Sequence, residues 1–185
     1  MPIEIEKKYR LSKRQWTLLM KRLVQIGARH LRDDVEENIL YSGDSLDVTK
    51  SVLRLRRVDQ HAILTYKERF SGTSSIKYQL EEETEVKDAE RMDAILNALG
   101  FAPALVYEKR RQRWNLGKAE IVLDELPFGL VMEIEAAEDE IRAIEMKLEI
   151  KGLRAVNATY PELVMKHGKR RGEMIESGFD FDDDA

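Results

Sequence analysis

Charged and apolar side chains alternate along several segments of the chain, and this two-residue period is the dominant pattern of the sequence. In the first segment, Glu4, Glu6 and Lys8 take every second position, with Ile3 and Ile5 between them. Successive side chains of a β-strand point to opposite faces, so the pattern predicts strands with one ionic and one apolar face. Strands are predicted at residues 2–10, 51–58, 62–70, 76–86, 106–114, 119–126 and 130–136, and residues 29–42 are expected to form one or two more.

Four other segments carry apolar residues at helical spacing. Ser12 is a suitable N-cap for the first, and Asp88 can cap the second, which is predicted to run through residue 99. The third helix is predicted over about residues 138–149. Pro161 fits the first turn of the fourth, which is expected to continue to about residue 171.

The chain is interpreted as one domain with a short C-terminal appendage. No linker divides its 185 residues, and a single domain over residues 1–175 is of ordinary size. The basic run at 167–173 is interpreted as the solvated end of the last helix, where it suits the helix dipole, and phosphate binding is the less favoured alternative. Residues 176–185 are predicted to be a disordered acidic tail.

Total charge, rather than net charge, sets the composition apart. Charged residues make up 36% of the chain, but 31 basic and 35 acidic residues leave a net charge of only −4, which argues against a protein that coats nucleic acid. The absence of cysteine excludes disulfides and thiolate catalysis, and the three histidines are too scattered for a metal motif. No apolar run approaches 18 residues, so we expect a soluble, cytoplasmic protein.

In seven predicted strands the charged residues keep to one face. The helices can cover the apolar faces, and the ionic faces then point either to water on an open sheet or to each other inside a closed barrel. An eight-stranded barrel has an interior that holds side chains or one small ligand. Burying an unpaired charge costs several kcal/mol and a buried pair often only breaks even, so an ionic barrel makes sense if it binds something. Carboxylates bind Mg²⁺ or Mn²⁺, and arginine and lysine bind phosphate, which together indicate a metal–polyphosphate ligand.

Short charged motifs follow one another along these strands in a fixed order. They are E-x-E-x-K (Glu4, Glu6, Lys8), L-R-x-R (Arg54, Arg56), the lysine of TYKE (Lys67), E-x-E (Glu83, Glu85), K-x-R (Lys109, Arg111), the acidic end of VLDEL (Asp124) and a second E-x-E (Glu133, Glu135). Over residues 2–136 this order resembles the CYTH superfamily, the triphosphate tunnel metalloenzymes. TYPEL at 159–163 is similar to the start of the family's C-terminal helix.

The resemblance implies an α+β fold in which an eight-stranded antiparallel β-barrel forms a tunnel, with helices packed on its outside. It also implies that the tunnel binds a triphosphate compound with a divalent metal, Mg²⁺ or Mn²⁺. The expected catalytic residues are Glu4, Glu6 and Lys8. The expected substrate-binding residues are Lys8, Arg54, Arg56, Lys67, Lys109 and Arg111, and the expected metal ligands are Glu4, Glu6, Glu83, Glu85, Asp124, Glu133 and Glu135.

Two groups of residues fit the family pattern less directly. Many members carry a basic residue shortly before the E-x-E pair that Glu83 and Glu85 form here. This chain has Lys77, Gln79 and Glu81 at those positions, so Arg69 or Lys77 is expected to substitute. Arg113, Glu81 and Glu120 share the ionic face but are interpreted as structural ion pairs near a tunnel mouth.

The favoured function is a metal-dependent phosphohydrolase acting on inorganic triphosphate or on an organic or nucleoside triphosphate, because this needs only the charges visible in the sequence. One alternative is a class IV adenylyl cyclase that converts ATP to cyclic AMP, which would require an adenine pocket that no motif specifies. The second is a non-catalytic polyphosphate- or nucleotide-binding module. The expected partner is a small-molecule triphosphate, with neither nucleic acid nor a membrane, and a homodimer is left open.

Overall fold

The computed structural model describes residues 3–70, 75–150 and 152–179. Its elements in chain order are β1 (Ile3–Leu11), α1 (Lys13–Gln25), β2 (Arg29–Ser42), β3 (Ser51–Val58), β4 (His61–Arg69), β5 (Ile76–Val86), α2 (Ala89–Ala98), β6 (Ala102–Leu116), β7 (Ala119–Leu126), β8 (Gly129–Glu135), α3 (Glu138–Leu148), α4 (Tyr160–His167), β9 (Lys169–Arg171) and β10 (Met174–Ser177). The strands predicted at 51–58, 76–86 and 119–126 have the expected bounds, and residues 29–42 form one strand.

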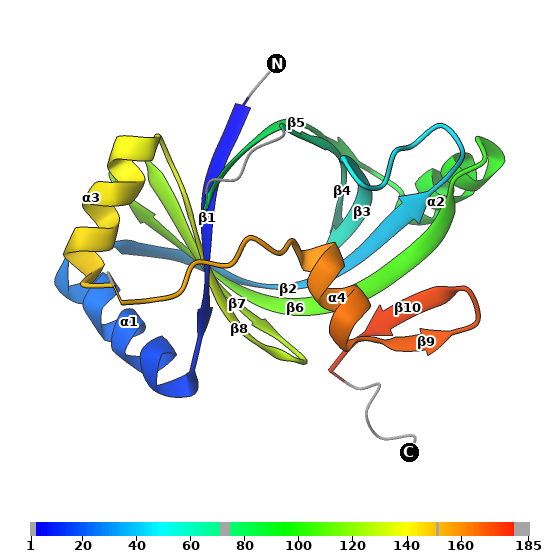
Figure 1. Ribbon diagram of the computed structural model, residues 1–185. Coiled ribbons are helices and arrows are strands. Elements are labelled where there is room, and N and C mark those ends of the chain that lie inside the picture. The colour runs from blue at the N-terminus through cyan, green and yellow to red at the C-terminus, as the bar shows by residue number, and fades with distance from the viewer. Residues whose placement is uncertain (1–2, 71–74, 151, 180–185) are drawn as a thin grey trace.

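The first eight strands form a closed antiparallel barrel. Their order is β2-β3-β4-β5-β1-β8-β7-β6, and β6 pairs back onto β2. In this closing pair Glu36 lies opposite Lys109 and Asp34 lies opposite Arg111. Figure 1 shows the strands curving around a common centre, with the helices at the periphery. The predicted fold class is therefore confirmed.

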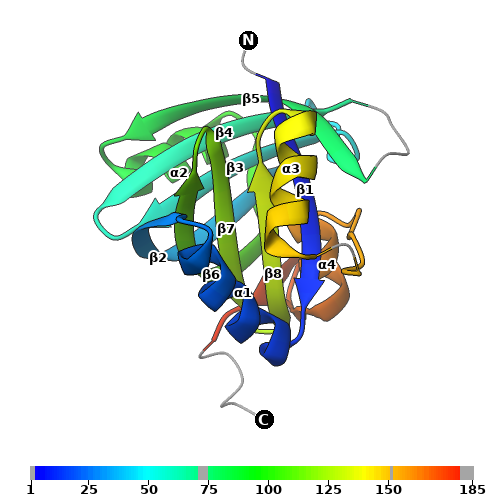
Figure 2. The same cartoon turned by 90° about the vertical axis from the view of Figure 1, so that its left-hand side faces the viewer.

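The apolar faces of the strands point outward and are covered by helices. Leu19 and Leu23 of α1 and Ile141 of α3 belong to one buried cluster with Ile121 of β7 and Ile134 of β8. Figures 1 and 2 show α1 and α3 side by side against the outside of this part of the barrel. A second cluster joins α2 to β3 on the outside. The cluster around α4 differs, because its members Leu40 and Tyr107 line the cavity together with Tyr160 of α4. The rest of the inner faces is left mainly to the charged residues.

Side-chain caps fix where α1, α2 and α4 begin, whereas α3 begins after Ala137 without one. Ser12 caps α1 in a capping box with Gln15, and Asp88 caps α2 through the backbone N–H of Arg91. Thr159 caps α4, again in a capping box, with Glu162 as the partner. These caps satisfy N–H groups that have no partner within the helix. The predicted helix starts at Ser12 and Asp88 are confirmed.

The C-terminal region differs from the prediction. The helix expected to reach about residue 171 ends at His167, because the chain turns at Gly168 into a β9–β10 hairpin. A side chain at Gly168 would meet backbone oxygen atoms at 2.8 Å, so only glycine fits the turn. The basic run therefore lies largely in an exposed strand rather than at a helix end.

The predicted acidic tail starts too early. Glu176 and Ser177 belong to β10, which pairs in parallel with Val106 and Tyr107 of β6. Residues 180–185 of the predicted tail lie outside the described residues, and the disorder expected for them stays a prediction. Within the described ranges, no helix has the length and apolar character needed to cross a bilayer.

Candidate functional site

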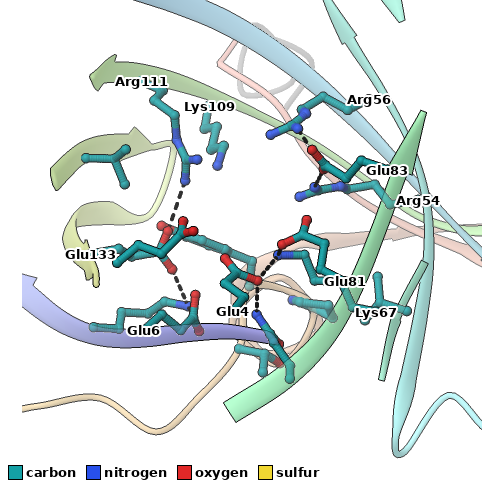
Figure 3. Close-up of a pocket in the computed structure, with 18 of the residues that line it drawn as sticks. Glu4, Glu6, Arg54, Arg56, Lys67, Glu81, Glu83, Lys109, Arg111 and Glu133 are labelled. Atoms are coloured by element: carbon teal, nitrogen blue, oxygen red, sulfur yellow. Dashed lines mark hydrogen bonds and ion pairs between the residues drawn. The ribbon is translucent and has the colours of Figure 1, made fainter. Parts of the chain in front are cut away.

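A cavity of about 280 Å³ lies inside the barrel, and the ionic faces of the strands line it. Most of the residues predicted for the site contribute to its wall. These are Glu4, Glu6, Lys8, Arg54, Arg56, Lys67, Glu83, Lys109, Arg111, Glu133 and Glu135. Figure 3 shows many of these side chains pointing toward one another across the cavity from different strands. The two-residue period along the strands thus becomes a single charged chamber in space.

One side of the chamber, the β6–β8 wall, consists of Lys109 and Arg111 on β6, Asp124 on β7 and Glu133 on β8. Arg111 binds both oxygens of Asp124, at 2.7 Å from Nε and 2.6 Å from Nη2, and reaches Glu133 at 3.0 Å. Lys109 lies 3.3 Å from Asp124. All four side chains are buried. Every charge on this wall therefore has a partner within the fold.

Lys8 of β1 adjoins the β6–β8 wall. Its ammonium lies 2.7 Å from Glu133 and 3.7 Å from Glu6. Burial opposes its charge, but these two carboxylates outweigh the burial and raise the pKa of Lys8. Burial and the neighbouring Arg111 instead lower the pKa of Lys109 to about 8. Lys109 is therefore a lysine whose charge depends strongly on the anions around it.

The opposite side, the β3–β5 wall, consists of Arg54 and Arg56 on β3, Lys67 on β4, and Glu81 and Glu83 on β5. Glu83 accepts hydrogen bonds from Arg54 at 3.3 Å and from Arg56 at 3.0 Å. The side chain of Glu83 is 36% exposed, whereas that of Asp124 is fully buried. The arginines of this wall are thus held by a carboxylate that solvent or a ligand can reach.

Glu4 of β1 and Glu81 form a close carboxyl pair at the edge of the β3–β5 wall. Lys67 lies 2.6 Å from Glu4 and 2.9 Å from Glu81, and the amide of Gln79 donates to Glu4 at 2.6 Å. Burial and the hydrogen bond with Glu4 raise the pKa of Glu81 to about 8. Burial would raise the pKa of Glu4 as well, but its hydrogen bonds and Lys67 lower it to about 2. At neutral pH the pair therefore holds one proton.

Three functional candidates on β2 were missed in the sequence. Glu36 is fully buried and lies 3.0 Å from Arg113, 3.2 Å from Lys109 and 3.8 Å from both Arg56 and Arg111. Asp34 pairs with Arg113 at 2.6 Å, and the buried amide of Asn38 has no hydrogen-bond partner in the described residues. The signal that could have identified them is the alternation of Asp34, Glu36 and Asn38 in DDVEEN.

The residues interpreted as structural ion pairs have a wider role. Arg113 does pair with Glu120, at 2.7 Å, and Glu81 pairs with Lys67. Arg113, Glu81 and Glu120 also line the cavity, so they can contact a ligand as well as one another or Lys67. Of the two proposed basic substitutes, Arg69 lines the cavity and Lys77 lies 3.5 Å from Glu6.

Two predicted metal ligands are not brought to the cavity surface. Glu85 lies at the end of β5, opposite Ile63 of β4, where it is exposed and outside the cavity lining. Asp124 is buried behind the lining and is already bound by Arg111, Lys109 and Tyr160. The structure thus places Glu85 apart from the other predicted ligands, because β5 carries it beyond the chamber.

The remaining acids fit a divalent cation by charge and by chemistry. Burial and the carboxylates of Glu4 and Glu120 raise the pKa of Glu135 to about 7. Glu4, Glu81 and Glu135 therefore form a patch with more negative charge than the fold neutralises, made of oxygen donors that Mg²⁺ and Mn²⁺ prefer. In the part of the chain that is described, no three acidic or histidine side chains already converge in metal-binding geometry. Binding would require these carboxylates to lose protons and move together.

Comparisons with solved structures show the same fold in other proteins. PH1819 from Pyrococcus horikoshii is 26% identical, with a TM-score of 0.71 over 88% of this chain and 98% of that one. HpAC1 from Hippeastrum, an adenylyl cyclase candidate described as having a dominant triphosphatase activity, is 21% identical, with a TM-score of 0.69 over 92% and 98%. An adenylate cyclase candidate from Vibrio parahaemolyticus is 18% identical, with a TM-score of 0.69 over 88% and 98%.

No curated protein matches the sequence. A family model does, and it covers all eight barrel strands. The match is to the CYTH domain and extends over residues 2–159. This range holds the charged motifs and every lining residue of the chamber except Tyr160 and Pro161. The chain therefore belongs to the CYTH domain family.

Proposed function

We propose that this protein is a divalent-metal-dependent triphosphatase. The observation that supports the proposal most is the chamber itself, in which basic and acidic side chains from seven of the eight barrel strands face a cavity of about 280 Å³. Buried ion pairs on this scale contribute little net stability, so their retention suggests a binding role. Phosphate oxygens and a cation are the ligands that such a mixture of charges selects.

The basic residues would bind and orient the phosphate chain. Arg54 and Arg56 each present a guanidinium to the cavity beside the accessible Glu83, which a phosphate oxygen can replace as their acceptor. Lys109 and Arg111 are held opposite them on the other side of the chamber (Figure 3). Lys8 lines the cavity beside Glu133. Cations on both sides would stabilise the charge that builds up on the transferred phosphoryl group.

The acidic residues would hold the metal. Glu4, Glu6 and Glu135 are the favoured ligands. Glu4 and Glu135 belong to the acidic patch, and Glu6 is held less closely by its lysines, at 3.5 Å and 3.7 Å, than Glu133 is by Lys8 and Arg111. When bound, Mg²⁺ or Mn²⁺ supplies neutralisation of phosphate charge and a water molecule of lowered pKa. The proton shared by Glu4 and Glu81 would be released as the cation replaces it.

Adenylyl cyclase activity is the second candidate, because two of the similar structures are described as cyclase candidates. It would require the cavity to hold an adenine ring beside the phosphates. The apolar lining residues are few: Leu40, Val52, Tyr107, Val122, Tyr160 and Pro161. The cavity is predominantly ionic, so hydrolysis remains the first choice.

Incubation with tripolyphosphate, ATP or thiamine triphosphate tests the proposal. Each substrate is supplied with Mg²⁺, with Mn²⁺ or with a chelator, and phosphate and cyclic AMP are measured separately. We expect metal-dependent phosphate release from tripolyphosphate. Cyclic AMP from ATP without comparable tripolyphosphate breakdown would overturn the proposal in favour of the cyclase. Activity that survives the chelator would rule out the metal.

The variant Glu6→Gln tests the metal role of the first strand. We expect it to lose about 100-fold or more in turnover, because a neutral amide binds a divalent cation far more weakly than a carboxylate does. The matched control is Glu37→Gln, on the outer face of β2, which should keep full turnover. Thermal unfolding should show both variants folded. Full turnover in Glu6→Gln would show that this carboxylate does not hold the metal.

A further inference from the structure

One side chain of the chamber comes from a helix rather than from the barrel. Tyr160 is the first residue of α4, yet its side chain is buried and lines the cavity. Its hydroxyl donates a hydrogen bond to Asp124 of β7, and its ring stacks on Tyr107 of β6 with 6.2 Å between centroids. Tyr160 thus connects the C-terminal helix to the β6–β8 wall.

The ring of Tyr160 also contacts two lysines that belong to different strands. The ammonium of Lys8 on β1 lies 4.2 Å from the ring centroid, and that of Lys109 on β6 lies 4.8 Å from it. Both distances are within the range of cation–π attraction, and both lysines are almost fully buried. One aromatic ring therefore helps to hold two positive charges that would otherwise repel each other.

The position of the ring is fixed from outside the chamber. Thr159 and Glu162 form the capping box that starts α4, and Glu162 also lies 3.7 Å from Arg69 of β4. Just before α4, the carbonyl of Ala158 accepts a hydrogen bond from Lys77 of β5 at 3.4 Å. Val164, one turn into the helix, is fully buried. The segment that carries Tyr160 is thus tied to both sides of the barrel.

We propose that Tyr160 is a positioning residue that holds Lys8 and Lys109 ready for phosphate and holds Asp124 against Arg111. The aromatic ring acts on the two ammonium groups, while the hydroxyl acts on the carboxylate. A positive charge placed before the substrate arrives loses less freedom on binding, so the ring should contribute mainly to affinity. The part of this inference that concerns phosphate rests on the proposed function, whereas the placement of the lysines does not.

Two substitutions separate the two parts of the side chain. Tyr160→Phe keeps the ring and removes the hydroxyl, and Tyr160→Leu removes both. We expect the KM for tripolyphosphate to rise about tenfold in Tyr160→Leu with a smaller change in kcat, and we expect Tyr160→Phe to restore most of the affinity. The control is Tyr78→Leu, at a partly exposed tyrosine whose hydroxyl binds Glu138 outside the chamber, and its KM should equal that of the wild type.

Nuclear magnetic resonance gives a readout that does not depend on activity. The ε-methylene protons of Lys8 and Lys109, assigned with Lys8→Arg and Lys109→Arg, should be shifted upfield by the ring current in the wild type and in Tyr160→Phe. They should move to ordinary lysine positions in Tyr160→Leu. Ordinary positions already in the wild type would overturn the inference, even if Tyr160→Leu failed to fold.

The two readouts also separate this inference from the proposed function. If the wild type neither binds nor hydrolyses tripolyphosphate while the lysine shifts depend on the ring, the triphosphatase proposal fails and the placement of the lysines stands. An unchanged KM in a folded Tyr160→Leu variant of an active enzyme would overturn the role of the ring in substrate binding.

Discussion

The two sides of the chamber use the same kinds of residue but differ in how completely the fold satisfies them. On the β6–β8 wall, Asp124 is fully buried and accepts from Arg111, Lys109 and the hydroxyl of Tyr160. On the β3–β5 wall, the acceptor of Arg54 and Arg56 is Glu83, whose side chain is 36% exposed. The basic groups of the first wall would bind phosphate while they keep Asp124 as a partner, whereas those of the second can exchange Glu83 for phosphate.

This difference suggests a division of labour within one chamber. Charges that are buried and mutually bound keep their geometry when a ligand arrives, because each would lose a partner by moving. Charges held by an accessible carboxylate can exchange that carboxylate for a phosphate oxygen at little cost. The β6–β8 wall would then provide a rigid frame, and the β3–β5 wall would provide the groups that respond to substrate.

Removing Glu36, the buried carboxylate that several basic side chains share, should have the largest effect. Glu36→Leu removes the one buried carboxylate that Lys109, Arg111 and Arg113 all face. We expect the free energy of unfolding to fall by about 3–5 kcal/mol, the usual cost of leaving buried charges uncompensated. Urea denaturation at neutral pH measures it.

The neighbouring residue on the same strand provides the control. Glu37 points outward and pairs with the partly exposed Arg57 at 3.0 Å. Glu37→Leu should cost less than about 1 kcal/mol, as is usual for exposed pairs. Equal losses in the two variants would contradict the idea that the buried network carries the structure.

On the β3–β5 wall, an arginine can be removed with less damage to the fold. Arg56→Ala should raise the KM for tripolyphosphate by about 10- to 100-fold, since a hydrogen bond between charged groups contributes about 1.5–3 kcal/mol. Steady-state kinetics of phosphate release measures this, with Arg57→Ala on the outer face as the control. A KM that stays at the wild-type value in Arg56→Ala would show that substrate does not displace Glu83.

The two-residue period predicted the barrel and most of the chamber, because strand geometry converts alternation directly into faces. The same rule predicted the strand over residues 29–42 but not its ionic inner face, because Asp33 and Glu37 place charge on the outer face as well and so hide the alternation of Asp34, Glu36 and Asn38. The contribution of Glu36 depends on β2 closing the barrel against β6, a pairing between distant parts of the sequence.

Two other features could not be predicted from the sequence, because they depend on tertiary contacts rather than on a local pattern. The β9–β10 hairpin is short and polar, and its long-range support comes from the parallel pairing of β10 with β6 and from Ile175, which packs against the cluster around α4. Tyr160 lies at the start of a helix, where it reads as an ordinary apolar residue after a cap. Its place in the chamber follows from where α4 is tied to the barrel, and the ionic pattern could not indicate an aromatic residue.

The last effect we expect concerns the proton between Glu4 and Glu81, and it runs in the direction of greater stability. A free glutamate titrates near pH 4.5, whereas the pKa of Glu81 is raised to about 8 in the fold. The folded protein therefore holds this proton more tightly than the unfolded chain does. The resulting stabilisation is complete below pH 4.5 and is lost as pH rises through 8. Glu81→Gln removes this titration, and its amide can still donate to Glu4.

In metal-free protein, the stability of Glu81→Gln relative to the wild type should therefore increase steadily between pH 5 and pH 9. Urea denaturation at several pH values in the presence of a chelator measures the difference, and Glu82→Gln, at the exposed neighbouring position, should show none. Parallel pH profiles for Glu81→Gln and the wild type would mean that the two carboxyls do not share a proton. A rising difference would show that two ionised carboxylates at this place cost stability when no cation is bound, as expected for a pair kept for cation binding.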